Sequence, residues 1–376
     1  MPLPYAPSDL LTLGVEVELQ ILDGATWDLA PGAPGIFERL GGPRENIKPE
    51  LFQAMLEIST GICRSAAEIR RDLAAAIGEV RAAALALNLR LASAGSHPFA
   101  RHRDRLIYPA ERYQGLIDRN RWIARRLMIF GMHVHVGVRD GDHAMALING
   151  LSPYLPHLLA LSASSPFWQG SDTGLASCRT TVFEALPTGG HPCSFATWRD
   201  FEQAYDAMIA ARAIKSIKDI WWDIRPHPDT GTIEVRVCDG CPTLSETVAL
   251  VALVHSLCVW LDERYVAGER FPTQAEWMMR ENKWRASRWG LDADLVLDTT
   301  GRSRSVRLEL EDLVRTLERY AARVSATVEL AAVADQLRRP GSHERQRRTF
   351  ERQGSLERVA EGLVREFETD RPQAPA

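Results

Sequence analysis

Lysine is scarce in this chain of 376 residues: of its 45 basic residues, only Lys48, Lys215, Lys218 and Lys283 are lysines, and the rest are arginines. The net charge is −4 and the pI is about 6.2. A chain without a basic excess gives no support for a nucleic-acid-binding or membrane-surface protein. We therefore expect neither a nucleic acid nor a membrane as a partner.

Cysteine is also sparse, with six residues scattered through the chain. The first residues lack the basic segment and apolar run with which a secretory signal begins. We find no uncharged apolar stretch of about 18 residues, the length that a membrane span needs. These absences favour a soluble, cytoplasmic protein with reduced thiols.

Several familiar site motifs are missing. No Gly-x-x-x-x-Gly-Lys-Ser/Thr sequence occurs, which excludes a P-loop nucleotide site, and no His-Glu-x-x-His sequence supports a zinc hydrolase. Cys238-x-x-Cys241 has no second cysteine pair, so a zinc or redox role for it has little support. Any nucleotide must therefore be held through metal ions and arginines.

Four segments alternate apolar and polar residues with the period of two that predicts β-strands. Their apolar side chains would pack into a core, and their polar side chains would lie on the opposite face. These polar side chains are Glu16 and Glu18 in residues 13–21, Glu57 in 55–60, His133 and His135 in 132–138, and Glu234 and Arg236 in 233–237. If the four strands share one sheet, its polar face carries carboxylates, imidazoles and an arginine.

Apolar periodicity and capping boxes predict that most other segments are helical, with a short strand at 91–98. Capping boxes begin helices after Ser65 and Thr243, and Thr197 caps a third helix. The other predicted helices are 110–127, 141–163 with a break near its prolines, 274–288, 306–339 and 345–368. The Gly- and Pro-rich residues 23–43 predict a loop. No internal repeat or linker divides the chain.

The polar face indicates a multi-metal phosphate site. Carboxylate oxygens with a histidine nitrogen suit Mg²⁺ or Mn²⁺, and so many carboxylates would repel one another without cations. Arg236 has no role in a pure metal cage, but it suits a phosphoryl group in transfer between metal-bound oxygens. The alternatives are a solvated surface for Glu16 and Glu18, a surface pair or zinc ligands for the histidines, and a Glu234–Arg236 ion pair.

Seven motifs in order resemble those of the carboxylate–amine ligases of the glutamate–cysteine ligase type 2 family. They are Gly14-Val-Glu-Val-Glu18, Met55-Leu-Glu-Ile-Ser-Thr60, Gly131-Met-His-Val-His-Val136, Asp172-Thr-Gly-Leu-Ala-Ser-Cys-Arg179, Trp221-Trp-Asp-Ile-Arg-Pro226, Thr232-Ile-Glu-Val-Arg-Val237 and Glu281-Asn-Lys-Trp-Arg285. Gly-Met-His-x-His and Ile-Glu-x-Arg are similar, more distantly, to elements of glutamine synthetase.

The resemblance implies a single catalytic α+β domain over residues 1–376, with a core of 10–290 and a C-terminal helical part of 300–368. Its curved, mainly antiparallel sheet would have about six strands, with helices on the convex face and a funnel on the concave face, as in the catalytic domain of glutamine synthetase. Apolar surface on the C-terminal helices makes a homodimer an expectation.

The resemblance also implies a reaction. ATP and two or three Mg²⁺ ions, or Mn²⁺, would convert a carboxylate into an acyl phosphate, which an amine then attacks to form an amide. Weak glutamate–cysteine ligase activity, with glutamate as the carboxylate and cysteine as the amine, is one expected form. A guanidino-kinase-type phosphotransferase and a non-catalytic metabolite-binding protein are the alternatives.

Site residues are carried over by position. Metal binding is implied for Glu16, Glu18, Glu50, Glu57, His133 and Glu234. Arg236 would stabilise the phosphoryl group in transfer, with the second catalytic arginine, Arg225, and His135 near the phosphates. Arg179 would bind the substrate carboxylate, and Arg285 the substrate or the nucleotide.

Overall fold

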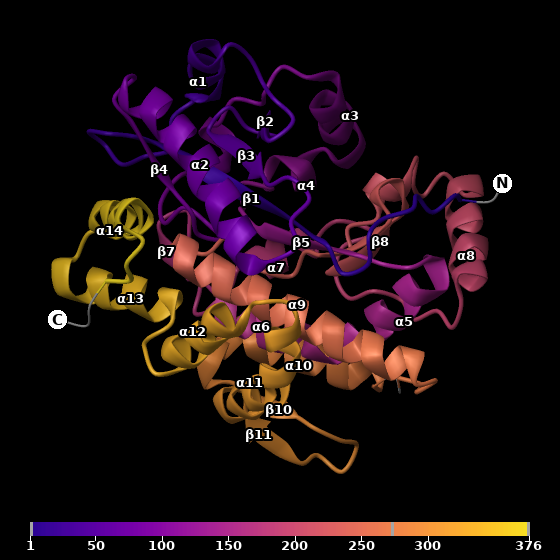
Figure 1. Ribbon diagram of the computed structural model, residues 1–376. Coiled ribbons are helices and arrows are strands. Elements are labelled where there is room, and N and C mark those ends of the chain that lie inside the picture. The colour runs from indigo at the N-terminus through magenta and orange to yellow at the C-terminus, as the bar shows by residue number, and fades with distance from the viewer. Residues whose placement is uncertain (1–2, 272–273, 374–376) are drawn as a thin grey trace.

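A seven-stranded antiparallel sheet lies at the centre of the protein (Figure 1). This computed structural model describes residues 3–271 and 274–373. The strand order is β2-β3-β1-β5-β9-β8, and β4 pairs with the far end of β1. The strands are β1 (Leu13–Asp23), β2 (Ile47–Pro49), β3 (Met55–Ser59), β4 (Leu89–Ala92), β5 (Met132–Gly137), β8 (Ile224–His227) and β9 (Thr232–Val235). The predicted α+β class with an antiparallel sheet is confirmed.

Strand β1 shows why one face of the sheet is buried. Its odd-numbered residues from Leu13 to Ile21 are all aliphatic and at most 4% exposed. They join one core cluster with apolar residues of four helices, namely α2 (Ala66–Leu85), α5 (Gly141–Leu151), α6 (Leu155–Ser162) and α9 (Leu244–Val266). Each buried aliphatic side chain contributes about 1.5–3 kcal/mol. The helices therefore cover the apolar face, and the polar face is left for the site.

Two segments are long and apolar enough, by length and composition, to cross a membrane: Gly141–Ser162 and Leu244–Val266. Neither is an unbroken run of uncharged apolar residues, because Asp142 and Asn149 lie in the first segment and Glu246 and Asp262 in the second. In the structure 72% and 78% of these windows are buried inside the protein. A core helix packed on all sides is apolar all round, and this accounts for both segments.

The capping residues begin their helices as predicted. Ser65 accepts a hydrogen bond from the backbone N–H of Glu68 at the start of α2. Thr243 caps α9 in the same way, and Thr197 forms a full capping box with Asp200 before α8 (Trp198–Ala210). Each oxygen satisfies an otherwise unpaired N–H in the first turn of the helix.

Other predicted boundaries were wrong. The predicted loop 23–43 contains α1 (Ala33–Leu40), with Pro34 in its first turn. The segments 110–127, 306–339 and 345–368 each form two helices: α3 (Glu111–Asn120) and α4 (Trp122–Arg125), α11 (Val306–Arg323) and α12 (Thr327–Leu337), α13 (Ser342–Gln353) and α14 (Leu356–Thr369). Residues with positive φ interrupt them: Arg121, Ser325 and Gly354. The predicted strand 91–98 is the shorter and earlier β4.

The remaining elements are short or peripheral. They are α7 (Arg179–Phe183), α10 (Glu276–Trp289) and the two hairpins β6 (Phe167–Trp168) with β7 (Ser171–Asp172) and β10 (Asp294–Val296) with β11 (Ser303–Ser305). Of these, α7 carries one predicted site residue, Arg179, and α10 carries another, Arg285.

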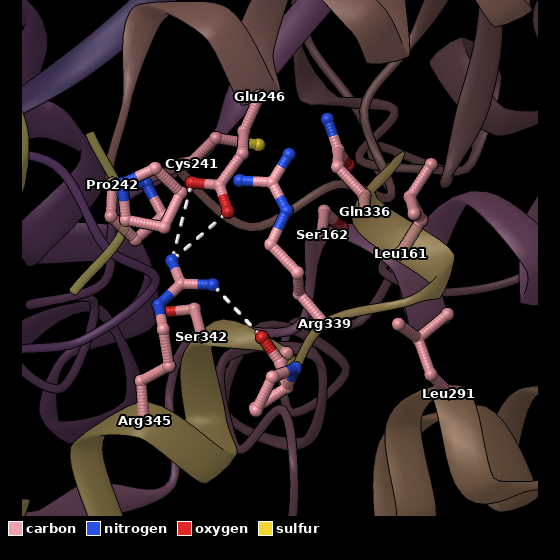
Figure 2. A pocket seen from close by; sticks show the side chains of 13 residues that line it. Leu161, Ser162, Cys241, Pro242, Glu246, Leu291, Gln336, Arg339, Ser342 and Arg345 are labelled. Carbon is pink, nitrogen blue, oxygen red and sulfur yellow. Dashed lines mark hydrogen bonds and ion pairs between the residues drawn. The ribbon is translucent and has the colours of Figure 1, made fainter. Parts of the chain in front are cut away.

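A buried ion-pair cluster ties the C-terminal helices to the rest of the chain (Figure 2). Arg345 on α13 donates to Glu366 on α14 at 2.7 Å and to Glu246 on α9 at 3.0 Å. Its side chain is only 7% exposed, so removal of Arg345 would leave two neighbouring carboxylates without their counter-charge. The end of the chain is thereby anchored to α9, which packs behind the sheet.

Candidate active site

A cavity of about 1040 Å³ opens over the polar face of the sheet. Its lining includes every predicted site residue except Arg285: Glu16, Glu18, Glu50, Glu57, His133, His135, Arg179, Arg225, Glu234 and Arg236. Eight of these ten residues come from six strands and helices spread over more than half of the chain, and Glu50 and Arg236 directly follow β2 and β9. The sheet therefore brings together the groups that the sequence pattern placed on separate strands.

Strand register sets which of these side chains are neighbours. Glu16 on β1 lies opposite His133 on β5, and Glu18 lies opposite Glu57 on β3. His135 and Arg225 both lie opposite Glu234, on either side of β9. Directly opposite residues in an antiparallel pair have Cβ atoms about 4.5–5.5 Å apart, so each pair is within reach.

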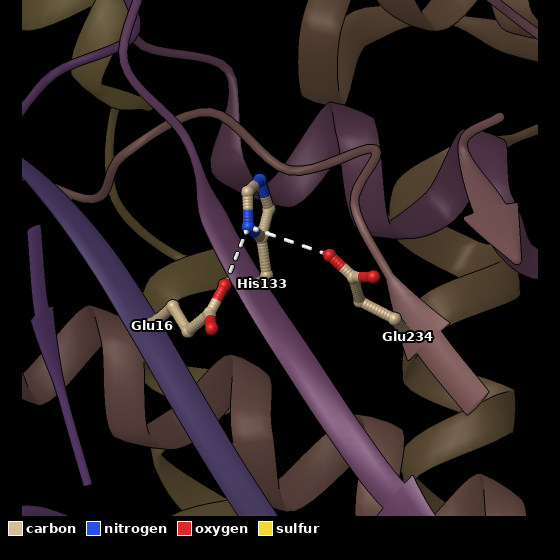
Figure 3. A group of neighbouring side chains, drawn as sticks. All are labelled: Glu16, His133 and Glu234. Carbon is tan, nitrogen blue, oxygen red and sulfur yellow. Dashed lines mark hydrogen bonds and ion pairs between the residues drawn. The ribbon is translucent and has the colours of Figure 1, made fainter. Parts of the chain in front are cut away.

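The tightest cluster consists of Glu16, His133 and Glu234 (Figure 3). The His133 Nδ1 atom lies 3.1 Å from a Glu16 oxygen and 3.6 Å from a Glu234 oxygen. One ligand atom from each of the three residues lies within 4.8 Å of the others. His133 Nε2 is buried and has no hydrogen-bond partner among the described residues. The imidazole nitrogen that faces both carboxylates is Nδ1, so the two carboxylates and His133 Nδ1 form a donor set that fits a divalent cation.

Glu234 is held as a buried carboxylate between two arginines. Its side chain is 1% exposed, and it accepts hydrogen bonds from Arg225 Nε at 2.6 Å and from Arg236. Burial alone would raise the pKa of Glu234, but the two guanidinium groups outweigh burial and hold the pKa well below its usual range. The arginines are thus fixed in place by a charge that they also neutralise.

A second group of carboxylates lies on the β3 side of the cavity. Burial and the nearby Glu18 raise the pKa of Glu50 to about 7. Burial, Glu16 and Glu50 raise the pKa of Glu57 well above its usual range. Lys48 lies 3.6 Å from Glu57, and its charge is not enough to offset this repulsion. Additional positive charge next to these carboxyl groups would therefore relieve their mutual repulsion.

Arg179 reaches the cavity from α7 and is only 3% exposed. Its guanidinium donates to the backbone oxygens of Arg236 at 3.3 Å and Val237 at 3.4 Å. Its Nε has no partner among residues 3–271 and 274–373. A buried guanidinium with unused donor capacity is suited to bind an anionic group in the cavity.

Gly131 explains how Arg179 fits against the sheet. A Cβ atom at residue 131 would lie 2.7 Å from the Arg179 Cζ atom, which is closer than van der Waals contact allows. The Gly131 N–H also donates a hydrogen bond to Glu18 Oε2. The glycine of the Gly-Met-His-x-His motif therefore leaves space for one site residue and orients another.

We expect Gly131→Ala to destabilise the protein by about 1–3 kcal/mol, because the new methyl group must displace Arg179. In an Arg179→Ala background most of this cost should vanish, since the clashing side chain is gone. Denaturant unfolding of the two single variants and the double variant measures this coupling. Gly78→Ala in α2, where a Cβ meets open space, is the control and should stabilise the helix. Equal costs in both backgrounds would contradict the packing argument.

The buried Asp239 is a further residue that the sequence pattern did not reveal. It is 0% exposed and accepts hydrogen bonds from Ser165 Oγ at 2.7 Å, Ser177 Oγ at 2.9 Å and the Ser164 N–H at 2.9 Å. Ser165 Oγ in turn accepts from the Arg179 N–H. This network fixes the loop that leads into α7, and thereby the start of the helix that carries Arg179.

Lysine scarcity was a signal that the sequence reasoning did not use. Three of the four lysines, Lys48, Lys215 and Lys218, line the cavity. The fourth, Lys283, is buried and donates to Asp223 at 2.5 Å. In a chain that otherwise uses arginine for its positive charges, three lysines lie in the candidate site and the fourth forms a buried ion pair. Arg112, Arg119 and Trp221 are further lining residues that were not predicted.

Arg285 is not brought to the cavity. Its guanidinium donates to Glu281 at 2.7 Å and to the backbone oxygen of Asp294 at 3.0 Å, on the outer side of α10. Lys283 of the same motif points the other way, into the interior. Cys238 and Cys241 are free and buried, and burial raises the pKa of Cys238 to about 12, so neither is a reactive thiolate at neutral pH.

The fold has clear counterparts among solved structures. Glutamate–cysteine ligase of Francisella tularensis in complex with AMP superposes with a TM-score of 0.68 at 13% identity, over 97% of this chain and 90% of that chain. A bifunctional glutathione synthetase of Pasteurella multocida gives 0.69 at 16% identity, over 96% of this chain and 52% of that chain. The fold is therefore that of the glutamate–cysteine ligase class of enzymes.

Sequence comparison narrows this class to a family. Residues 12–362 match the family described as "Glutamate-cysteine ligase family 2 (GCS2)". A relative from Bdellovibrio bacteriovorus named "Putative glutamate--cysteine ligase 2" is 47% identical over 98% of both chains, and one of the same name from Thermobifida fusca is 43% identical over 99% of this chain and 94% of that one. The chain belongs to glutamate–cysteine ligase family 2, and the protein is a carboxylate–amine ligase.

Proposed function

We propose that this ligase uses ATP to convert a carboxylate into an acyl phosphate, which an amine then attacks to form an amide. One observation carries the proposal: a cluster of two carboxylates and a histidine shares the cavity with two largely buried arginines, Arg225 on β8 and Arg236 directly after β9. Metal ligands beside fixed guanidinium groups suit phosphoryl transfer between two anions.

The donor sets favour Mg²⁺ or Mn²⁺ as the metal, with two or three ions. Glu16, His133 and Glu234 would hold one ion, since their ligand atoms already converge. Glu18, Glu50 and Glu57 would hold another, because their mutual repulsion is relieved by added positive charge. Bound ions would neutralise the phosphates of ATP and polarise the phosphorus–oxygen bond that breaks.

Three arginines act on the reacting groups in this proposal. Arg236, with Arg225 and His135 beside it, would stabilise the charge on the phosphoryl group as a carboxylate oxygen bonds to the γ-phosphorus and ADP leaves. The amine nitrogen then bonds to the acyl carbon, loses a proton and expels phosphate. Arg179 would bind the substrate carboxylate. Nothing in this scheme needs a covalent protein nucleophile.

Glutamate and cysteine are the proposed substrates, because the relatives and the structural counterpart are named for this reaction. The protein is proposed to act in the cytoplasm. All six cysteines are free in the structure, in line with a reducing compartment. A homodimer is proposed as its assembly.

The test is ADP and phosphate release by the purified protein with Mg–ATP, across a panel of acids and amines that includes glutamate with cysteine. We expect equal amounts of ADP and phosphate, and only when both substrates are present. ADP without phosphate would indicate a kinase-type phosphotransferase. If no pair of substrates gives turnover and no nucleotide binds in Mg²⁺, the result would favour the alternative of a non-catalytic metabolite-binding protein.

The raised carboxyl pKa values predict how stability depends on pH. The folded state holds a proton on Glu50 up to pH about 7, whereas an unfolded glutamate loses it near pH 4.3. Stability is therefore fully present below about pH 4.3 and is lost as the pH rises from there to about 7, by roughly 4 kcal/mol for this group. Added Mg²⁺ should reverse the loss, because the ion replaces the protons.

Thermal melting in EDTA between about pH 5.5 and about pH 8.5, compared between the wild type and Glu50→Gln, measures this dependence. The wild-type melting temperature should fall more steeply with pH than that of the variant, and excess Mg²⁺ should flatten the wild-type curve. Parallel curves in EDTA would show that Glu50 ionises at its ordinary pKa.

A further inference from the structure

A second cavity of about 620 Å³ lies next to the active-site cavity and shares no lining residue with it. Leu51 lines the active-site cavity, and the next residue, Phe52, lines the second cavity. In the same way, α3 lines the active-site cavity and the adjoining α4 lines the second cavity. The lining residues are Phe52, His102, Arg103, Arg105, Trp122, Arg125 and Gln169. We refer to these seven residues as the arginine pocket.

The arginine pocket lies in the most basic segment of an acidic protein. Residues 101–126 contain eight arginines and three acidic residues, although the whole chain carries a net charge of −4. Arg105 is paired with Asp28 at 2.8 Å. The side chains of Arg103 and Arg125 have no hydrogen bond or ion pair with any residue in 3–271 or 274–373. Two lining guanidinium groups thus lack a counter-charge.

The pocket also has an aromatic wall. Trp122 is 63% exposed, an unusual position for so large an apolar ring, and the Arg126 guanidinium lies 4.4 Å from its ring centre. His102 stacks on Trp168 with ring centres 6.5 Å apart and an angle of 21°. Burial and Arg126 lower the pKa of His102, so its ring is neutral at pH 7. A flat ligand finds stacking surface here.

One buried polar atom of the pocket lining, His102 Nδ1, lacks a partner among the described residues, and so does Trp168 Nε1, on the ring that stacks against His102 outside the lining. Buried polar atoms are nearly always satisfied, so each marks an unused hydrogen-bonding position. The backbone is strained beside them, with φ of 50° at Gln169 and 51° at Arg121. Such strain costs on the order of 1–3 kcal/mol per residue and gathers at ligand-binding segments.

We propose that the arginine pocket binds a mononucleotide-type anion, with its phosphate between Arg103 and Arg125 and its base against Trp122. Guanidinium groups pair with phosphate oxygens in a bidentate manner, and aromatic side chains stack on any base. A bare phosphate would leave the aromatic wall unused. A nucleic-acid polymer would need a basic surface beyond one pocket, and the chain as a whole is acidic. The site is independent of the proposed ligase reaction.

The test measures binding of AMP to the full-length protein by isothermal titration calorimetry in EDTA, which removes the metal ions that the active site would use. We expect one site whose affinity falls about tenfold or more in Arg103→Gln/Arg125→Gln, since each charged hydrogen bond is worth that much. Trp122→Ala should also lower the affinity for AMP, by about five- to 100-fold. The matched control Arg39→Gln/Arg199→Gln removes two exposed, unpaired arginines elsewhere and should bind AMP as the wild type does.

Further binding measurements identify which part of AMP is recognised and which site binds it. Adenosine and inorganic phosphate, tested separately, should each bind more weakly than AMP. The active-site variant Arg225→Ala should retain binding in EDTA. Loss of AMP binding in Arg225→Ala with retention in Arg103→Gln/Arg125→Gln would place the nucleotide in the active site alone and overturn the proposal. Absence of wild-type binding, or phosphate as tight as AMP, would overturn it as well, and neither result bears on ligase activity.

Discussion

Replacing Arg236 with alanine should lower turnover by about three orders of magnitude, while nucleotide binding in Mg²⁺ changes only a few-fold. Arg236 lines the cavity, and its Nε atom has no hydrogen-bond partner among the described residues. It can therefore stabilise charge that develops during phosphoryl transfer. Glu234 keeps its 2.6 Å hydrogen bond from Arg225 in the variant, and its buried charge stays compensated. The loss should therefore appear in kcat rather than in folding.

ADP release with saturating substrates measures kcat, and calorimetry with a non-hydrolysable ATP analogue in Mg²⁺ measures binding. Arg64→Ala is the control, because this arginine is 73% exposed and pairs with Asp9 far from the cavity. A melting temperature close to that of the wild type shows that the variant is folded. Turnover within tenfold of the wild type would remove Arg236 from the phosphoryl-transfer step.

Glu16→Gln should weaken divalent-cation binding by about 100-fold or more, because a neutral amide replaces a charged oxygen ligand. Glu16 lies opposite His133, whose Nδ1 atom is 3.1 Å from Glu16 and 3.6 Å from Glu234. Burial alone would raise the pKa of Glu16, but His133, hydrogen-bonded at 3.1 Å, and the nearby His135 outweigh burial and hold the pKa well below the usual range, so the wild-type group is ionised. Glutamine keeps the shape of the side chain and loses only the charge.

Mn²⁺ binding followed by electron paramagnetic resonance gives the affinity directly, and the Mg²⁺-induced rise in melting temperature gives a second measure. Glu111→Gln is the matched control, since Glu111 lines the cavity outside the cluster and is exposed. We expect this control to bind metal as the wild type does. An unchanged Mn²⁺ affinity in Glu16→Gln would show that the cation is held elsewhere in the cavity.

Much of the site was predictable because strand alternation is a local property. Each of β1, β3, β5 and β9 places its polar residues on one face, and that assignment needs only the period of two. The residues that depend on distant contacts were not predictable. Asp239 gave no pattern, because its role arises from three serine and backbone groups more than 60 positions away.

Arg285 shows the limit of transferring a role along a motif. Helical geometry turns neighbours on α10 by about 100° per residue, so Lys283 and Arg285 cannot face the same side. Lys283 lies in the interior beside Asp223, and Arg285 is left on the outer surface. The helix breaks at Arg121 and Ser325 were missed for a related reason, since no glycine or proline marks these positive-φ residues.

The sequence by itself determined which strand residues share a polar face and which kinds of ligand atom they carry, because hydrophobic periodicity and residue chemistry are local. Its ordered motifs carried the family resemblance that implied the fold. Only the tertiary structure decided that Glu16 faces His133, that two arginines hold one buried carboxylate, and that Arg103 and Arg125 are left without partners among the described residues. Register, burial and counter-charge are set by residues far apart in the chain. They exist only once the sheet is assembled.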